Sequence, residues 1–182
     1  IYYNIHMIKK NKYYLIIENS RDLNLSIIKL RKKFCIIYRN KKSNEDFNSL
    51  LKFRKKCLHK NIDFFVANDL ILFKRLRADG LYISAHNKDL SVKKFRFNRA
   101  SIIGSAHNLK EIKLKLLQGC SDVIFSRLYK TAYNYKESFL GIVKFNLRIM
   151  SYKHNLIPLG GINAKNFKNL RLIKSDSFVL FS

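Results

Sequence analysis

Cysteine is scarce in this chain of 182 residues, and its few copies are not arranged for cross-linking. The three cysteines, Cys35, Cys57 and Cys120, are odd in number, and none belongs to a Cys-x-x-Cys pair. Disulfide frameworks and small zinc sites need paired or clustered cysteines, so this pattern argues against both. It favours reduced thiols and therefore a cytoplasmic protein.

Long hydrophobic runs are also missing. No apolar run approaches the ~18 residues that a membrane span requires, so no membrane partner is expected. The run 13–17, near the basic N-terminus, is too short for a signal peptide. Because the first residue is Ile1 rather than methionine, the chain is interpreted as a fragment or as an incorrectly assigned gene start, with Met7 as the candidate start. Residues 1–12 are a candidate N-terminal extension.

Acidic residues are few. The chain has 12 of them against 37 lysines and arginines, a net charge of +25. Such a charge is typical of nucleic-acid binding, and a basic RNA-binding protein is one hypothesis. The basic residues are spread along the whole chain, however, and the excess of Lys, Ile, Asn, Tyr and Phe is what an AT-rich coding sequence produces. Nucleic acid is therefore not the expected partner, and phosphorylated small molecules account for some of the lysines.

What the chain does contain is a series of short β-branched or aromatic runs. They are nearly continuous in apolar character, as strands buried on both faces are. The eight runs are Tyr13–Ile17, Cys35–Tyr38, Asp63–Val66, Gly80–Ile83, Ser101–Gly104, Asp122–Phe125, Ile157–Leu159 and Ser177–Phe181.

Helical patterns lie between most of these runs. The segment from Asn44 to His59 is one, and Asn108 with Glu111 forms a capping box at the start of another. Strands that alternate with helices form parallel βα units. We therefore predict a single domain over residues 1–182, a (β/α)8 TIM barrel that lacks the last helix. A doubly wound open sheet is the alternative.

Polar residues collect directly after the predicted strands. In a barrel these positions share one end, where active sites are built. Any one of them can also be a helix cap or a solvated turn. They are Arg39 and Lys41, Asn68 and Asp69, Asp89, Ser105 and His107, Thr131 and Lys136, Gly160 and Gly161, and Ser182.

Two groups among these residues suit phosphate. Arg39, Lys41 and Lys136 are cationic donors for phosphoryl oxygens. Gly160-Gly161 follows the only proline of the chain, and glycine lets bare N–H groups approach an anion. A tight turn is the alternative reading of the glycine pair.

The helix expected after the glycine pair would strengthen phosphate binding there. Asn163 is expected to cap a helix that carries Phe167 and Leu170, whose dipole would attract the same anion.

The carboxylates Asp69 and Asp89 are candidate Mg²⁺ ligands, with phosphate oxygens completing the shell. Each can instead be a helix-start carboxylate. The histidines have no metal-ligand spacing, and His107 is interpreted as a helix cap. No catalytic role is therefore assigned to a histidine.

Together these signals resemble the thiamine phosphate synthase family, which also includes a thiazole tautomerase branch. Six motifs occur in the family's order along nearly the whole chain. They are Tyr38-Arg39-Asn40-Lys41 (similar to Q-Y-R-x-K), Phe65-Val66-Ala67-Asn68-Asp69, Ala78-Asp79-Gly80-Leu81-Tyr82 (similar to A-D-G-V-H), Ile103-Gly104-Ser105-Ala106-His107, Lys130-Thr131, and Gly160-Gly161-Ile162-Asn163.

The resemblance implies a Mg²⁺-assisted enzyme that joins hydroxymethylpyrimidine diphosphate to thiazole phosphate and releases pyrophosphate. Its partners would be phosphorylated small molecules, with a homo-oligomer left open. The roles it implies are diphosphate binding for Arg39, Lys41 and Asn68, Mg²⁺ binding for Asp69 and Asp89, a place at the reacting centre for Ser105, the displaced loop lysine for Lys136, and thiazole phosphate binding for Thr131, Gly160, Gly161 and Ser182.

The chain departs from the family pattern at several positions. Ile37 replaces the motif's Gln, Tyr82 replaces its His, and Ser126-Arg127 stands where Gly-Pro is usual. A thiazole tautomerase-like or catalytically degenerate relative is therefore the alternative function. Retention of the diphosphate and metal residues favours the synthase.

Overall fold

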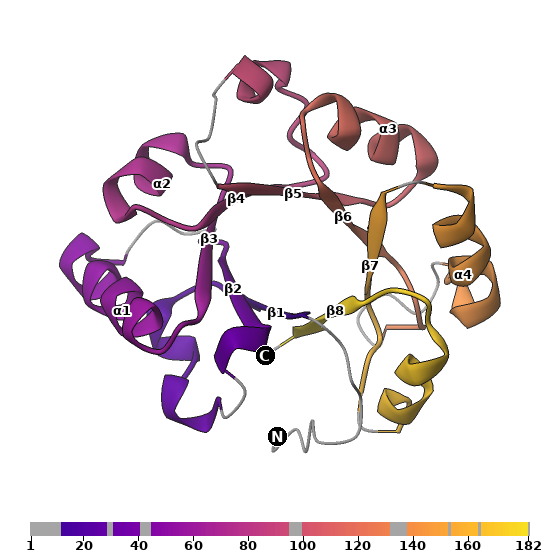
Figure 1. Ribbon diagram of the computed structural model, residues 1–182, viewed down its shortest axis with the longest axis horizontal. Coiled ribbons are helices and arrows are strands. Elements are labelled where there is room, and N and C mark those ends of the chain that lie inside the picture. The colour runs from indigo at the N-terminus through magenta and orange to yellow at the C-terminus, as the bar shows by residue number, and fades with distance from the viewer. Residues whose placement is uncertain are drawn as a thin grey trace.

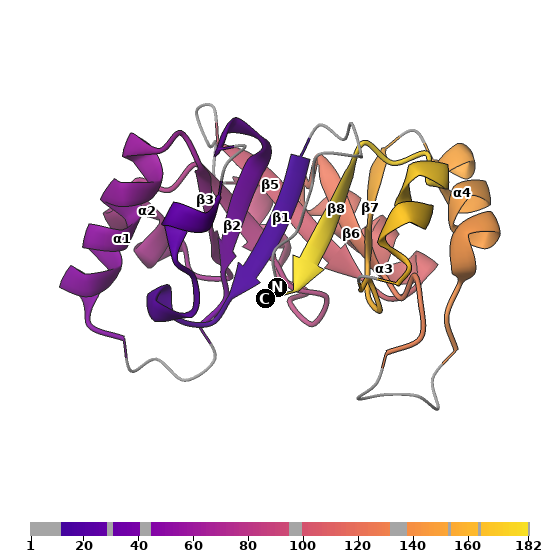
Figure 2. The ribbon, with the colours of Figure 1, turned by 90° about the horizontal axis from the view of Figure 1, so that it is seen from below.

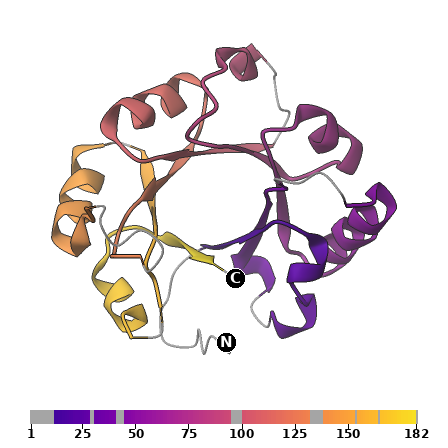
Figure 3. The ribbon, with the colours of Figure 1, turned by 180° about the vertical axis from the view of Figure 1, so that it is seen from behind.

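Eight parallel strands form a ring with helices around its outside in the computed structural model (Figure 1), and Figure 3 shows the ring from the other side. The structure describes residues 12–28, 31–40, 45–94, 100–131, 138–152, 154–163 and 165–181. The strands are β1 (Lys12–Ile17), β2 (Phe34–Tyr38), β3 (Asp63–Ala67), β4 (Gly80–Ile83), β5 (Ser101–Ala106), β6 (Asp122–Ser126), β7 (Asn155–Leu159) and β8 (Ser177–Phe181).

All eight predicted strands are confirmed, and so is the (β/α)8 barrel. From β1 to β7 each strand pairs with the next one in chain order, and β8 pairs with β1. A doubly wound sheet reverses its strand order at one point, so that alternative is wrong. The described residues end with β8, and no helix follows it there.

Helices or short 3₁₀ turns connect successive strands on the outside of the ring. In the described part of the chain four are α-helices: α1 (Phe47–His59), α2 (Leu70–Leu76), α3 (Leu109–Leu117) and α4 (Gly141–Ser151). The 3₁₀ segments are η2 (Ser20–Asp22), η3 (Leu25–Ile27), η4 (Arg31–Lys33), η5 (Leu90–Lys94) and η7 (Phe167–Leu172). Among the described helices, none is long and apolar enough to cross a membrane.

Side-chain caps start the first three α-helices. Asp46 accepts from the amide of Ser49 at 2.9 Å, and Asp69 caps α2 in the same way. Asn108 caps α3 as predicted, and Glu111 accepts from the amide of His107, one residue before the cap. Each cap satisfies amides that the first helical turn leaves without partners.

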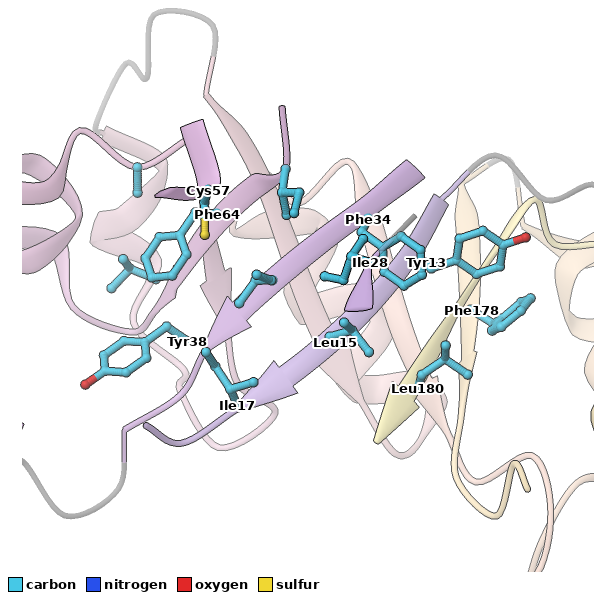
Figure 4. Packing of buried hydrophobic residues seen from close by; sticks show 14 of the residues in the cluster. Tyr13, Leu15, Ile17, Ile28, Phe34, Tyr38, Cys57, Phe64, Phe178 and Leu180 are labelled. Atoms are coloured by element: carbon cyan, nitrogen blue, oxygen red, sulfur yellow. The ribbon is translucent and has the colours of Figure 1, made fainter. Parts of the chain in front are cut away.

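Alternation along the strands divides the core into two layers. Tyr14 and Ile16 point into the barrel, where they meet residues such as Ile103 and Ile157. Tyr13, Leu15 and Ile17 point outward, toward the helices, as Figure 4 shows for β1 and its neighbours. Because every strand is covered on both faces, its apolar run is nearly unbroken, and this is why the runs were visible in the sequence.

The three cysteines lie in these apolar layers, buried and unpaired. Burial raises the pKa of Cys57 to about 12 and that of Cys120 to about 12. A thiol with so high a pKa is a poor nucleophile, so the cysteines serve as core residues.

One charged residue of α1 is tied to the start of β4. The guanidinium of Arg54, which is 6% exposed, donates from Nη2 to Asp79 Oδ1 at 2.9 Å and to the carbonyl of Arg77 at 2.9 Å. The other oxygen of Asp79 accepts from the amide of Phe64 at 2.8 Å.

We expect Asp79→Ala to lower the free energy of unfolding by about 2–3 kcal/mol, because it leaves a buried guanidinium without its counter-charge. Urea denaturation measures the change. Asp176→Ala, at an exposed carboxylate, is the control and should change stability by less than about 0.5 kcal/mol. Equal stabilities for the two variants would contradict the assignment.

Candidate active site

The carboxyl ends of the strands share one end of the barrel. Figure 2 shows β1 and β8 running to that end, at the lower edge of the view. Eight of the predicted site residues are described, and all lie at or just beyond a strand's carboxyl end. They are Arg39, Asn68, Asp69, Asp89, Ser105, Thr131, Gly160 and Gly161. The predictions for Lys41, Lys136 and Ser182 lie outside the described residues.

At the mouth of the barrel Tyr82 is hydrogen-bonded to Ser105, and Arg39 is near enough to act on Tyr82 by its charge. Tyr82 is 2% exposed on the inner face of β4, and its phenol is hydrogen-bonded to the side chain of Ser105 on β5. Burial raises the pKa of Tyr82, while this hydrogen bond and the positive charge of Arg39 act in the opposite direction. The phenol is therefore protonated at neutral pH. Tyr82, known from the sequence only as a departure, thus lies beside the predicted site residue Ser105.

The backbone holds Arg39 at this position. Its amide donates to the carbonyl of Ile17 at 2.8 Å, which continues the pairing of β1 and β2 beyond the strands. The side chain is half-buried and comes one residue after the outward-facing Tyr38. Because strand residues alternate between the faces, Arg39 is directed toward the barrel mouth.

Asn68 connects two neighbouring loops. It has a φ of 55°, and its amide donates to the carbonyl of Tyr82 at 2.8 Å. Its side-chain oxygen accepts from the amide of Ser84 at 3.0 Å and from Asn87 Nδ2 at 3.3 Å. The carboxamide NH₂ of Asn68 bonds no other described residue and is available to a ligand.

Asp69 and Asp89 stand after β3 and β4, and both make local hydrogen bonds. Asp69 Oδ1 accepts from the amide of Leu72 at 2.8 Å, while its second oxygen bonds no described residue. Both oxygens of Asp89 accept from Ser91, one from its amide at 2.8 Å and one from its hydroxyl at 2.7 Å. The described residues contain no group of three or more His, Cys, Asp or Glu side chains that could hold a metal ion. A cation here would need oxygens from a substrate as well.

The glycine pair after β7 lies under the loop that follows β6. Gly160 and Gly161 have φ values of 103° and 68°, a region that favours glycine. A Cβ on Gly160 would lie 2.9 Å from Arg127 Cγ, and one on Gly161 would lie 2.5 Å from the carbonyl oxygen of Lys130. The amide of Tyr129 donates to the carbonyl of Gly160 at 3.0 Å. The tight turn and the close approach therefore both require bare backbone here.

Unsatisfied polar groups gather at the same place. The amides of Gly161 and Ile162 donate to no described residue. The hydroxyl of Thr131, one residue beyond Lys130, is buried and has no hydrogen-bond partner among the described residues. Buried polar groups of this kind are rare in folded proteins unless a ligand or water satisfies them. The group suits the oxygens of an anion.

After the glycine pair the structure differs from the predicted helix. Asn163 accepts from the amides of Lys165 and Asn166 in a turn, and η7 then forms six residues of 3₁₀ helix. So short a segment has no substantial dipole, and it does not begin at Asn163. The attraction for an anion must come from the amides themselves.

One contact at the mouth was missed by the sequence reasoning. His107 Nδ1 lies 2.6 Å from the hydroxyl of Ser126, and the ring of His86 is 6.4 Å from that of His107, centroid to centroid. The parallel register pairs Ala106 with Phe125, so the next residues of β5 and β6 are brought side by side. The register of β5 and β6 is therefore the signal from which the contact of His107 with Ser126 could have been predicted.

Comparisons with known proteins agree with this architecture. Residues 5–182 match the family model described as thiamine monophosphate synthase. The chain is 29% identical over 182 residues to the thiamine-phosphate synthase of Pelagibacter ubique, covering 93% of this chain and 86% of that protein. It is 28% identical over 123 residues to the thiamine-phosphate synthase of Methanococcus vannielii, covering 65% of this chain and 58% of that protein.

Solved structures share the fold. The thiamine phosphate pyrophosphorylase of Pyrococcus furiosus superposes with a TM-score of 0.71 at 20% identity, over 96% of this chain and 87% of that one. The 3-keto-L-gulonate-6-phosphate decarboxylase of Vibrio cholerae gives a TM-score of 0.63 at 16% identity, over 94% of this chain and 88% of that one. At such identities these likenesses establish the barrel and not the chemistry.

Proposed function

The chain belongs to the thiamine monophosphate synthase family, and from this premise we propose that it condenses hydroxymethylpyrimidine diphosphate with thiazole phosphate. The thiazole nitrogen forms a bond to the pyrimidine methylene carbon. The carbon–oxygen bond to the diphosphate breaks, and pyrophosphate leaves with the electron pair. The products are thiamine phosphate and pyrophosphate.

The arrangement of two anion-binding groups across one barrel mouth carries this proposal. Arg39 and Asn68, after β2 and β3, are assigned to the diphosphate, and the carboxamide NH₂ of Asn68 is available to it. Gly161 and Thr131 supply donors that no described residue satisfies, on the far side of the mouth, after β7 and β6. Ser105 of β5 lies between these groups along the ring, which is where two phosphorylated substrates would meet.

Catalysis in this proposal is mainly electrostatic. Arg39 neutralises negative charge that develops on the departing pyrophosphate, and it does so in a half-buried position where charges interact more strongly than in water. Tyr82 and Ser105 are neutral hydrogen-bonding groups at the inner wall, placed to orient the pyrimidine. The proposal gives Lys41 to the diphosphate, and Gly160 and Ser182 to the thiazole phosphate. Lys136, in the loop that follows β6, is proposed as the catalytic loop lysine.

Mg²⁺ fits the oxygen ligands available here. Asp69 has a carboxylate oxygen that bonds no described residue, and Asp89 adds a second carboxylate, whose oxygens accept from Ser91. We assign the ion to these two carboxylates and to diphosphate oxygens. When bound, Mg²⁺ would supply charge neutralisation for the leaving group.

The test of the function is a thiamine phosphate formation assay with both substrates, with and without Mg²⁺. Product that depends on Mg²⁺ is the expected result. A folded protein that binds thiazole phosphate but forms no product would contradict the proposal.

Asp69→Asn separates the two roles of this residue. Asparagine is as good a helix cap as aspartate, so the free energy of unfolding should change by less than about 0.5 kcal/mol. The loss of the carboxylate charge should raise the Mg²⁺ concentration for half-maximal activity about tenfold. A Mg²⁺ titration of turnover measures this. An unchanged titration curve would show that the cation binds elsewhere.

The contact of His107 with Ser126 favours a second candidate function, a thiazole tautomerase-like activity. Ring tautomerisation removes a proton at one atom and delivers one at another, and histidine is the usual group for both steps. His107 Nδ1 is held by Ser126 at 2.6 Å, which orients the ring at the same mouth.

Under this alternative, His107→Gln should lower tautomerase turnover about 100-fold. Proton exchange into thiazole phosphate from deuterated water, followed by NMR, measures the reaction. Lys110→Gln, at an exposed position of α3, is the control. No exchange by the unaltered protein would eliminate this alternative.

The remaining assignments are proposals of the same kind. We propose one domain over residues 1–182 with residues 1–12 as an extension, although Lys12 already belongs to β1. The expected setting is the cytoplasm, and the expected partners are phosphorylated small molecules. RNA capture by the net charge of +25 would instead give an affinity that falls steeply with salt.

A further inference from the structure

A buried lysine on α3 is not used by the proposed reaction. Lys115 is 0% exposed, and its aliphatic stem crosses the outer face of β5 at Gly104. A Cβ on Gly104 would lie 2.8 Å from both Cγ and Cδ of Lys115. The glycine therefore leaves the room through which the lysine reaches the next loop.

The ammonium group of Lys115 is bonded entirely to neutral oxygens. Its Nζ donates to the carbonyl of Ser84 at 2.7 Å, to that of Asn87 at 2.6 Å and to Gln118 Oε1 at 2.8 Å. Burial lowers the pKa of Lys115, while the neighbouring Cys120 and Glu111 raise it by less. A buried ammonium without an ion pair is energetically costly, so a lysine here is not explained by stability.

Gln118, the residue that caps the end of α3, completes this arrangement. It is 0% exposed, and its Nε2 donates to the carbonyl of Asn87 at 3.1 Å and to that of Asp89 at 2.9 Å. Two side chains of one helix thus hold three carbonyls of the loop 84–89. We call Lys115 and Gln118 the α3 clamp.

The held loop belongs to one half of the active site. It carries Asp89, and the amide of Ser84 and the side chain of Asn87 both donate to Asn68. The clamp touches neither the glycine pair after β7 nor Thr131. The clamp therefore contacts only the side of the site that is assigned to the diphosphate and Mg²⁺.

We propose that Lys115 and Gln118 are positioning residues that hold the loop 84–89 in the conformation that binds the diphosphate and Mg²⁺. This inference rests on the proposed synthase function for its kinetic consequence, but not for its structural one. The clamp stiffens the loop by satisfying carbonyls that would otherwise be free to turn toward water.

The test uses Lys115→Met, which keeps the length of the stem and removes all three donors. Gln118→Leu removes the second half of the clamp and leaves the lysine in place. Lys113→Met, at an exposed position of the same helix, is the matched control. All three are compared with the unaltered chain.

Two readouts separate positioning from general stability. Hydrogen exchange at the amides of Ser84 and Asn87 should speed up about tenfold in both clamp variants, with the strand amides unchanged. The KM for the pyrimidine diphosphate and the half-saturating Mg²⁺ concentration should rise about tenfold. The KM for thiazole phosphate should stay within about twofold of its original value, and the control should change neither readout.

The outcomes that overturn the inference are specific. Equal rises in both KM values, unchanged exchange of the loop amides, or loss of folding in both clamp variants would each show that the clamp supports the barrel as a whole. If the unaltered chain forms no thiamine phosphate, the proposed function fails by itself. The clamp is then tested by hydrogen exchange at the loop amides and by calorimetric titration with pyrophosphate and Mg²⁺. The affinity for pyrophosphate should still fall about tenfold in the variants.

Discussion

Replacing Arg39 with alanine is expected to lower kcat/KM for thiamine phosphate formation about 1,000-fold while the barrel stays folded. The guanidinium stands half-buried at the end of β2, and its positive charge acts on the phenol of Tyr82 inside the barrel. It is the one arginine assigned to the diphosphate. Charge-assisted hydrogen bonds to phosphoryl oxygens are among the strongest that a side chain makes.

Stability should be unaffected by this change because the ordering contact of Arg39 is made by its backbone. Its amide bonds to the carbonyl of Ile17, and alanine keeps that bond. Arg39→Lys should retain part of the activity, since lysine keeps the charge and loses the bidentate fork. Lys32→Ala, at an exposed basic residue just before β2, is the control for a mere loss of charge. Activity of Arg39→Ala within about threefold of the original would remove Arg39 from the site.

Gly161→Ala is expected to lower the free energy of unfolding by about 3 kcal/mol and the affinity for thiazole phosphate at least about 100-fold. Two causes act together. The backbone has a φ of 68°, which costs an alanine about 1 kcal/mol. The new methyl would also meet the carbonyl oxygen of Lys130 at 2.5 Å, which forces the loop after β6 away.

Gly141→Ala separates these causes. Gly141 has a nearly equal φ of 70°, but a Cβ there meets nothing within 4 Å. It should therefore show only the backbone effect of about 1 kcal/mol and no change in thiazole phosphate binding. Chemical denaturation and calorimetric titration with thiazole phosphate measure both quantities. Equal destabilisation by the two substitutions would mean that the close approach to Lys130 does not matter.

Much of the fold could be predicted from the sequence because strands and helix caps depend on residues that are close together in the chain. A strand buried on both faces must be apolar along its length, so the runs of β1 to β8 stand out one by one. Caps are similarly local, and Asn108 with Glu111 marked the start of α3. Once the strands are placed in chain order around a ring, the polar residues after them must share one end. Arg39, Asn68 and Ser105 could therefore be placed at one end of the barrel from the sequence alone.

The contacts across that end were decided only by the tertiary structure. Tyr82 meets Ser105, and His107 meets Ser126, because parallel register brings together residues about 20 positions apart. Nothing in the local pattern around Lys115 distinguishes it from the exposed Lys113. Its burial follows from the space left by Gly104 and from carbonyls 28 and 31 residues away in the chain. The amino-acid sequence thus determined the barrel and the end that carries the site, since periodicity and strand order depend on near neighbours. Packing between distant segments decided which side chains touch, because hydrogen-bond geometry depends on backbone positions that no local pattern specifies.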